Sequence, residues 1–197
     1  MVGKIATIMA SANAPPASGT AILRAEHEQV LRVLAVAERM AERAASAAPL
    51  APADIDTLLA LLGPFVDQLH HAKEEQHLFP LLEDKGLPRA GGPVGVMLAE
   101  HERGRALIGE ITRLGGQPVG GRPWADAIRS YAELMRQHIV KENTILFARA
   151  ERLLSADEQA ALAQAFAQLD AQPPGADVRA RLGTDLARLE QAYPAHT

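Results

Sequence analysis

The sequence predicts an all-α protein, built as an antiparallel up-and-down four-helix bundle with one or two extra helices at the C-terminal end. Apolar residues make up 48% of the 197 residues, whereas aromatic residues make up only 4%. Such a balance favours helices, because strands prefer β-branched and aromatic residues. Apolar residues also recur at helical spacing in several long segments that short stretches rich in Gly or Pro separate. Long helices joined by short links pack most simply as an antiparallel bundle.

Proline, glycine and capping residues mark the ends of these helices. Thr20 is expected to cap the first helix, and Pro49 and Pro52 separate it from the second. Pro93 and Pro123 suit the first turns of the third and fourth helices. The four helices are therefore expected at residues 20–48, 53–84, 93–114 and 123–154.

The remaining C-terminal residues predict two shorter helices. Ser155 and Glu158 have the spacing of a capping box, which predicts a helix over 155–170. Apolar residues then recur at helical spacing from Val178 to Tyr193. We expect three parts in the chain, a flexible leader at 1–19, the bundle at 20–154 and a C-terminal extension at 155–197. The extension is expected to pack on the bundle, so that the protein is a monomer, or to form a homodimer through these helices.

Composition excludes several classes of protein. The absence of cysteine excludes disulfides, thiolate zinc sites and iron–sulfur clusters, so that any metal needs nitrogen and oxygen ligands. A net charge of −4 predicts no binding to nucleic acid or to a membrane surface. The apolar stretch at residues 5–10 is too short for a secretory signal, so a cytoplasmic protein is expected.

An internal repeat is the most informative feature of the sequence. The residues Ala-Glu-His-Glu at 25–28 in the first helix recur at 99–102 in the third. A second set recurs with identical spacing in the second and fourth helices, and it consists of His70, Lys73, Glu74, Leu78 and Phe79 matched by His138, Lys141, Glu142, Leu146 and Phe147. The chain therefore consists of two similar helical hairpins.

The repeat places chemically related side chains on the same helix faces. His70 and Glu74 are four residues apart, as are His138 and Glu142, so each pair presents an imidazole and a carboxylate from one face. In an antiparallel bundle the histidines of the first and third helices reach a similar depth. We therefore expect one interior metal site formed by His27, His70, Glu74, His101, His138 and Glu142. Two ions suit this set, and nitrogen with carboxylate ligands favours iron or manganese over copper or zinc.

Several neighbouring residues have open roles. His71 and Glu75 form a second pair rotated about 100° from the first, and each could be an additional ligand or a group behind the ligands. The alternative for His71 is a solvated position at a helix interface. His77 is expected to line an access path or to meet solvent. Tyr131 either donates a hydrogen bond to the site or fills the core. The acidic residues flanking the histidines are expected to point into solvent, with support of a ligand by one or two of them as the alternative, and they are Glu26, Glu28, Glu100 and Glu102.

The order His, His-x-x-x-Glu, His, His-x-x-x-Glu on four successive helices resembles the hemerythrin-like HHE cation-binding family over about residues 20–154. The resemblance implies a non-haem di-iron centre, bridged by both glutamates and an oxo or hydroxo group, with manganese or zinc as substitutes. It also implies that the centre binds or reacts with dioxygen, peroxide or nitric oxide. The branch of the family that repairs iron centres often has a cysteine-bearing N-terminal segment, and this sequence contains no cysteine.

Oxygen-carrying hemerythrins have five histidines, one glutamate and one aspartate, with two of the histidines on the third helix. Here the third helix offers only His101, which leaves the expected set one ligand short. The deficit favours a reaction of peroxidase, catalase or oxidase type over reversible oxygen carriage. Two other hypotheses stay open, an iron or gas sensor without turnover, and a bundle whose histidines only pack and hydrogen-bond.

Overall fold

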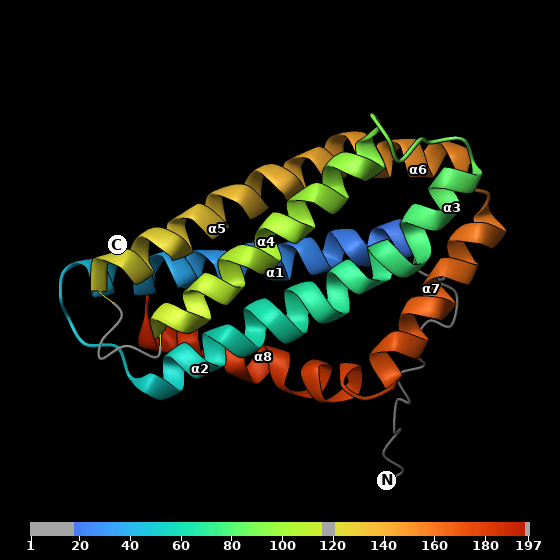
Figure 1. The fold of residues 1–197 in the computed structure, drawn as a ribbon. Coiled ribbons are helices and arrows are strands. Elements are labelled where there is room, and N and C mark those ends of the chain that lie inside the picture. The colour runs from blue at the N-terminus through green and yellow to red at the C-terminus, as the bar shows by residue number, and fades with distance from the viewer. Residues whose placement is uncertain (1–17, 116–120, 196–197) are drawn as a thin grey trace, which may run out of the picture.

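The computed structural model describes residues 18–115 and 121–195, and every regular element within them is a helix (Figure 1). The prediction of an all-α protein is therefore confirmed. Most of the predicted leader, residues 1–17, lies outside the described residues. Gly19, which we had placed in that leader, instead belongs to the first helix.

Four long helical segments correspond to the four predicted helices. The first is α1 (Gly19–Ala45) and the third is α4 (Pro93–Gly115). The second consists of α2 (Pro52–Ala60), η1 (Leu61–His71), η2 (Glu74–Leu78) and α3 (Phe79–Asp84), and the fourth of α5 (Gly121–Lys141), η3 (Glu142–Leu146) and α6 (Phe147–Leu153). Two further helices follow, α7 (Ala156–Ala171) and α8 (Gly175–Ala192).

Capping residues explain where two of the helices begin. Ser18, and not the predicted Thr20, caps α1, because its side chain accepts a hydrogen bond from the backbone N–H of Ala21. Thr20 instead donates from its backbone and its hydroxyl to the side-chain oxygen of Gln159 in α7. The capping box of Ser155 and Glu158 is present at the start of α7, as predicted.

Three segments of the second and fourth helices are π-helical, which means that their turns are wider than those of an α-helix. In η1 the cause includes Pro64, which has no N–H to donate within the helix. The segments η2 and η3 begin at Glu74 and Glu142, which occupy equivalent positions in the repeat. Both hairpins therefore widen at the same carboxylate.

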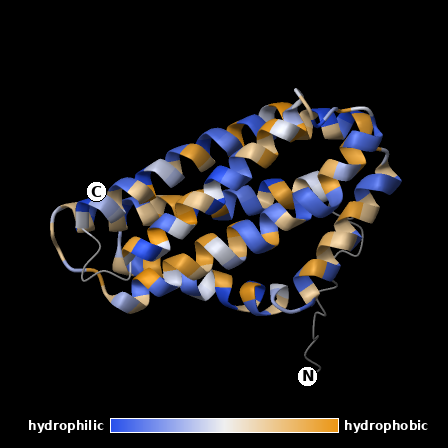
Figure 2. Cartoon of the chain, in the orientation of Figure 1, coloured by the Kyte–Doolittle hydropathy of each residue, from blue (hydrophilic) through white to orange (hydrophobic). Residues whose placement is uncertain are grey.

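The long segments lie side by side in a ring, in which α1 and α4 each contact both α5 and η1 (Figure 1). Hydrophobic and hydrophilic residues alternate along each helix, as Figure 2 shows, so that each helix can bury one face. None of the described helices is both long and apolar enough to cross a lipid bilayer.

The buried apolar residues form two clusters at different levels of the ring. One extends through Leu34, Phe65 and Trp124 and includes Leu186 and Leu189 of α8. The other contains Leu23, Phe79, Phe147 and, from α7, Leu162 and Phe166. The C-terminal helices thus contribute to both clusters. Along the long helices, the buried histidines lie near the points where residues of one cluster are followed by residues of the other, and the candidate site is found at this boundary.

Candidate metal centre

A buried polar layer lies between the two apolar clusters. It contains all six predicted ligands together with His71, and each of these seven side chains belongs to a residue at most 2% exposed. The members of this polar layer are His27, His70, His71, Glu74, His101, His138 and Glu142. Residues far apart in the sequence thus meet in the interior of the molecule.

Each of the two carboxylates lies between histidines of both hairpins. The Oε1 and Oε2 atoms of Glu74 lie 3.7 Å from Nε2 of His70 and 3.5 Å from Nε2 of His101. The Oε2 atom of Glu142 lies 3.1 Å from Nε2 of His27 and 3.2 Å from Nε2 of His138. Each carboxylate therefore lies close to one imidazole of each hairpin.

The layer divides into two groups whose ligand atoms all lie within 4.8 Å of one another. One group consists of His27, His70, Glu74 and Glu142, and the other of His71, Glu74, His101 and His138. Glu74 belongs to both. His71 is stacked on His101 with ring centroids 3.8 Å apart, and it lies in the same group of possible metal-binding side chains as His101.

Every histidine of the layer has its Nδ1 atom within hydrogen-bonding distance of a side-chain oxygen. Four of the partners are carboxylates, and because a carboxylate only accepts, these Nδ1 atoms donate. The pairs are His27 with Asn143 at 2.9 Å, His70 with Glu26 at 2.9 Å, His71 with Asp67 at 3.4 Å, His101 with Glu75 at 2.7 Å and His138 with Glu100 at 3.0 Å. A proton held on Nδ1 leaves the lone pair on Nε2, as a metal-binding imidazole requires.

The expectation that the flanking glutamates point into solvent is wrong for two of the four. Glu26 is 3% exposed and bonds His70, and the partly buried Glu100 bonds His138. Glu28 and Glu102 are exposed, as expected. In a ring of helices, the side of a helix next to its inward-facing residues is buried against the neighbouring helix. A residue adjacent to a histidine in sequence can therefore be buried as well. The repeated lysines could have predicted this burial, because Lys73 donates to Glu26 and Lys141 donates to Glu100.

Cations lie behind the oxygen partners of the histidines. Arg105 donates to Asp67 at 2.8 Å and to Glu75 at 2.5 Å. Burial raises the pKa of Glu75, but hydrogen bonds from His101 and Arg105 lower it more, so that the pKa lies below its ordinary value. The pKa of Glu100 is lowered in the same way by His138 and Lys141 against the effect of burial. These carboxylates therefore stay ionised and can orient the imidazoles.

Buried oxygen atoms without partners indicate what the polar layer is suited to hold. Neither oxygen of Glu74 or Glu142 accepts a hydrogen bond, and Nε2 of His27 is also without a hydrogen-bond partner. Burial, together with the charge of Glu142, raises the pKa of Glu74 well above its ordinary value. A buried carboxylate with no hydrogen bond is costly unless a cation compensates it. Nitrogen and carboxylate donors without sulfur fit iron or manganese.

Aromatic rings cover the layer on the side of the second apolar cluster. Phe147 is stacked on His27 at 5.3 Å and Phe79 on His101 at 5.7 Å between ring centroids. These two phenylalanines are equivalent in the repeat, and both are fully buried. They close that side of the layer to water.

Two further candidates lie outside the layer. His77 is partly buried and meets the edge of Phe166, with ring centroids 6.1 Å apart. Tyr131 is buried in the first apolar cluster and its hydroxyl has no hydrogen-bond partner, so it fills the core and does not donate to the site. Burial raises the pKa of Tyr131 well above its ordinary value.

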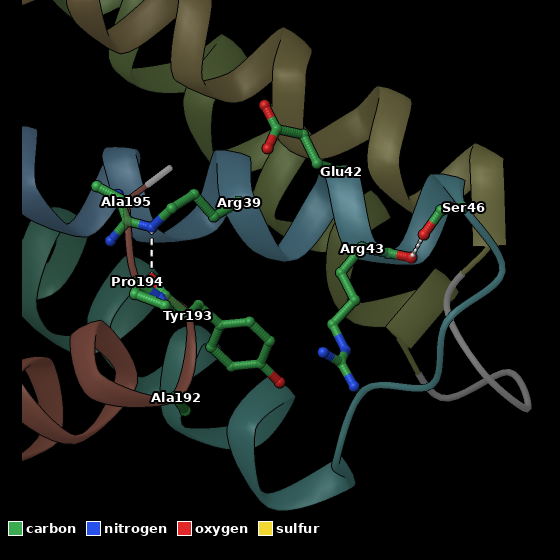
Figure 3. A pocket seen from close by; sticks show the side chains of 8 residues that line it. All are labelled: Arg39, Glu42, Arg43, Ser46, Ala192, Tyr193, Pro194 and Ala195. Atoms are coloured by element: carbon green, nitrogen blue, oxygen red, sulfur yellow. Dashed lines mark hydrogen bonds between the residues drawn. The ribbon is translucent and has the colours of Figure 1, made fainter. Parts of the chain in front are cut away.

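A surface hollow near the end of α1 is separate from this layer. Figure 3 shows that Arg39, Glu42 and Arg43 of α1, and Ser46 directly after it, line the hollow together with residues 192–195. Arg39 donates to the carbonyl oxygen of Tyr193 there. Arg39 is twelve residues from His27, or about 18 Å along the helix. The hollow therefore gives no access to the histidines.

Comparison with known proteins identifies the family. The hemerythrin HHE cation binding domain matches residues 18–150. A relative from Yersinia pestis (strain Pestoides F), named iron-sulfur cluster repair protein YtfE, is 33% identical over 134 residues, which are 64% of this chain and 59% of that protein. A protein of the same name from Escherichia coli O81 (strain ED1a) is 30% identical over 131 residues, 63% of this chain and 59% of its own length.

This chain therefore spans less than two thirds of the length of these relatives. No solved structure matches it significantly. The family match covers all seven residues of the polar layer and ends before α7. The chain belongs to the hemerythrin HHE cation-binding family.

Proposed function

We propose that the polar layer holds two iron ions and that this centre binds or reacts with dioxygen, peroxide or nitric oxide. One ion would be held by His27, His70 and both carboxylates, and the other by His71, His101, His138 and Glu74. The observation that carries the proposal is the pair of buried carboxylates that accept no hydrogen bond and lie between Nε2 atoms of both hairpins. The hairpins would form the up-and-down bundle of the family.

With His71 included, the layer offers five histidines and two carboxylates. The ligand deficit expected from the sequence then disappears, and the number of ligands no longer argues against reversible binding of dioxygen. The second candidate of the sequence analysis, an iron or gas sensor, stays a proposal for the same site. It is favoured by the contacts between α7, α8 and the ring of helices, because these could carry a change at the site to the surface.

The protein's own groups have three tasks at such a centre. The Nδ1 hydrogen bonds orient the imidazoles, the two carboxylates neutralise positive charge, and the apolar clusters with Phe79 and Phe147 exclude water. Iron, when bound, would supply the electron-transfer chemistry that these side chains lack. The names of the relatives add a third candidate, iron–sulfur cluster repair, through the 30–33% identity across this region.

The proposal is tested by mixing iron-loaded protein with peroxide, dioxygen or nitric oxide in separate stopped-flow experiments. We expect either consumption of peroxide or a change in the near-ultraviolet spectrum with one of the gases. The double variant His70→Ala/His138→Ala should abolish the response, whereas His77→Ala, outside the layer, should retain it. Loaded protein that responds to none of the three would contradict the proposal.

The three candidates differ in what accompanies the response. Turnover of peroxide favours an enzyme, whereas a change in assembly with little turnover favours a sensor. Restoration of an iron–sulfur protein whose cluster has been damaged would favour repair.

A further inference from the structure

Four charged side chains form a compact cluster behind His70, on the side away from the centre of the polar layer. Glu26 accepts a hydrogen bond from Lys73 at 2.5 Å and forms an ion pair with Arg179 of α8. Asp170 of α7 lies 2.7 Å from Nζ of Lys73 and 3.0 Å from Nε of Arg179. We call these four residues, Glu26, Lys73, Asp170 and Arg179, the C-terminal clamp. The oxygen of Glu26 that is not used in it, Oε2, bonds Nδ1 of His70.

The charges of the C-terminal clamp cancel, since it contains two carboxylates and two cations. The side chain of Lys73 is 0% exposed and that of Glu26 is 4% exposed, so removal of any partner leaves a buried charge unbalanced. Burial lowers the pKa of Arg179 and of Lys73, and Asp170 acts against this effect at Lys73. Aromatic faces also support the cations, since Arg179 lies 5.7 Å from the ring centroid of Phe65 and Lys73 5.8 Å from that of Phe166.

The equivalent pair in the other hairpin has no such clamp. Glu100 bonds His138 and accepts from Lys141, as Glu26 does from Lys73. The side chains of Glu100 and Lys141 are 17% and 34% exposed, and within the described residues no side chain of α7 or α8 pairs with them. The two halves of the repeat therefore differ in that one is tied to the C-terminal helices.

The corner between α7 and α8 is fixed against the ring of helices. A Cβ atom on Gly175 would lie 2.1 Å from the backbone oxygen of Leu169 and 3.2 Å from Cδ1 of Leu69 in η1. This close approach holds Asp170 and Arg179 on either side of the corner, next to the helix that carries His70. The packing around Gly175 therefore fixes the corner, and the fixed corner brings Asp170 and Arg179 into the C-terminal clamp.

We propose that Asp170 and Arg179 are positioning residues for the metal centre, which hold Glu26 against His70 and thereby strengthen retention of the ion held by His27 and His70. Both residues lie beyond residues 18–150, the part of the chain that matches the family. The inference rests on the proposed di-iron centre. It implies that the ion held by His27 and His70 dissociates more slowly when the C-terminal helices are docked than when they are displaced, whereas the other ion is not affected.

The first test is release of iron to a chelator from loaded wild type, Arg179→Ala, Arg179→Lys and Arg188→Ala. Arg188, also on α8, binds Asp54 and Thr57 of α2 and so controls for loss of a tether without touching the C-terminal clamp. We expect Arg179→Ala to release about one of its two ions roughly tenfold faster than wild type. Arg179→Lys should restore much of the retention, and Arg188→Ala should behave as wild type.

Equal acceleration in Arg179→Ala and Arg188→Ala, or none in either, would overturn the proposal. Asp170→Asn serves as a second variant if Arg179→Ala does not fold, and the same loss of one ion is expected from it.

A measurement on metal-free protein separates this inference from the proposed function. In nitrogen-15 NMR spectra of the histidine rings, Arg179→Ala should shift the His70 signals and leave those of His138 in place. Wild type that takes up no iron would defeat the proposed function, while the NMR comparison would still decide the positioning role. His70 signals unchanged by both Arg179→Ala and Asp170→Asn would refute that role.

Discussion

In the polar layer each imidazole donates from Nδ1 to a neighbouring oxygen, and this leaves Nε2 directed at the carboxylates. The oxygen atoms behind the histidines therefore orient the rings and set which nitrogen faces the carboxylates. Glu75 in the first hairpin accepts a hydrogen bond from His101 through its carboxylate. Asn143, at the equivalent position of the second hairpin, bonds His27 through its amide oxygen. The two halves therefore share a geometry but differ in the charge that supports it.

Replacing His71 tests whether it belongs to the centre. Because His71 stacks on His101 and lies in the group with His138, we expect His71→Ala to reduce iron from about two ions to about one per chain. The matched control is His77→Ala on the same helical segment, which should retain full occupancy. Metal analysis of both variants measures the effect. Full occupancy in His71→Ala would mean that His71 only packs against the ligands.

Replacing Glu74 tests the shared carboxylate. Glu74 belongs to both groups, so Glu74→Gln should lower the affinity for both ions. Glu75→Gln weakens the support of His101 and the ion pair with Arg105, and it should cost roughly 10–100-fold at one ion. The metal-free Glu74→Gln protein should be more stable than wild type by about 1 kcal/mol or more near neutral pH. Burial raises the pKa of Glu74 well above its ordinary value, so folding must either protonate this carboxyl or bury its charge, and an amide avoids both costs. Calorimetric titration with metal and urea unfolding check the two halves of this prediction. A destabilised metal-free variant would contradict it.

The repeat was sufficient to predict which six side chains meet, and the structure brings all six into one layer. The sequence left His71 open, because on an ideal α-helix it points about 100° away from His70. The solvent-facing assignment of Glu26 failed for a different reason. Its burial depends on Lys73 and on two residues of the C-terminal helices. The sequence around Glu26 does not predict contacts with residues so distant in the chain.

At the scale of the elements, the wide turns of η1 in the second helix explain the position of His71. The π-helical segment η1 ends at His71, and there both adjacent histidines are buried. A π-helix contains more residues per turn than an α-helix. A prediction that assumes 3.6 residues per turn therefore assigns the side chains of this segment to the wrong helix faces. The helix boundaries were easier to predict, since Gly, Pro and capping residues mark them locally. The largest difference among the four long helices is the end of the first, predicted at 48 and found at Ala45.

Two glycines of α8 give opposite predictions. Gly175→Ala should destabilise the protein by about 1–3 kcal/mol, because the added methyl group would meet the backbone of Leu169 and force the corner outward. Gly183→Ala has nothing within 4 Å of the added atom and should stabilise the helix by about 0.5–1 kcal/mol. Urea unfolding of the two metal-free variants measures both. Similar effects of the two substitutions would mean that the corner does not pack as described.

At the scale of the whole molecule, two similar hairpins enclose a polar layer between two apolar clusters, and the C-terminal helices add to both clusters. The sequence predicted that α7 and α8 are helices with an apolar side. It could not predict where they dock, because an amphipathic pattern shows that a face is covered but not what covers it. Their contacts with η1 and α1 supply the C-terminal clamp.

Metal should stabilise the whole fold, because ions bound only by the native protein shift the unfolding equilibrium toward it. Chelation of the loaded protein should therefore lower its melting temperature, by an amount that grows with the affinity for the ions. Scanning calorimetry with and without chelator measures the shift. In the presence of chelator, Glu74→Gln should melt a few degrees above the wild type, as its predicted gain in stability requires. An unchanged melting temperature of wild type on chelation would contradict a metal buried in the core.

The most direct test of the account is metal content by mass spectrometry on protein produced in iron-sufficient medium, together with the near-ultraviolet spectrum of its oxidised form. The account predicts about two iron ions per chain, held by the histidines and the two carboxylates of the polar layer. A correctly folded helical protein that contains no metal, and takes up none when iron is added, would show that the repeated histidines and glutamates serve the fold alone.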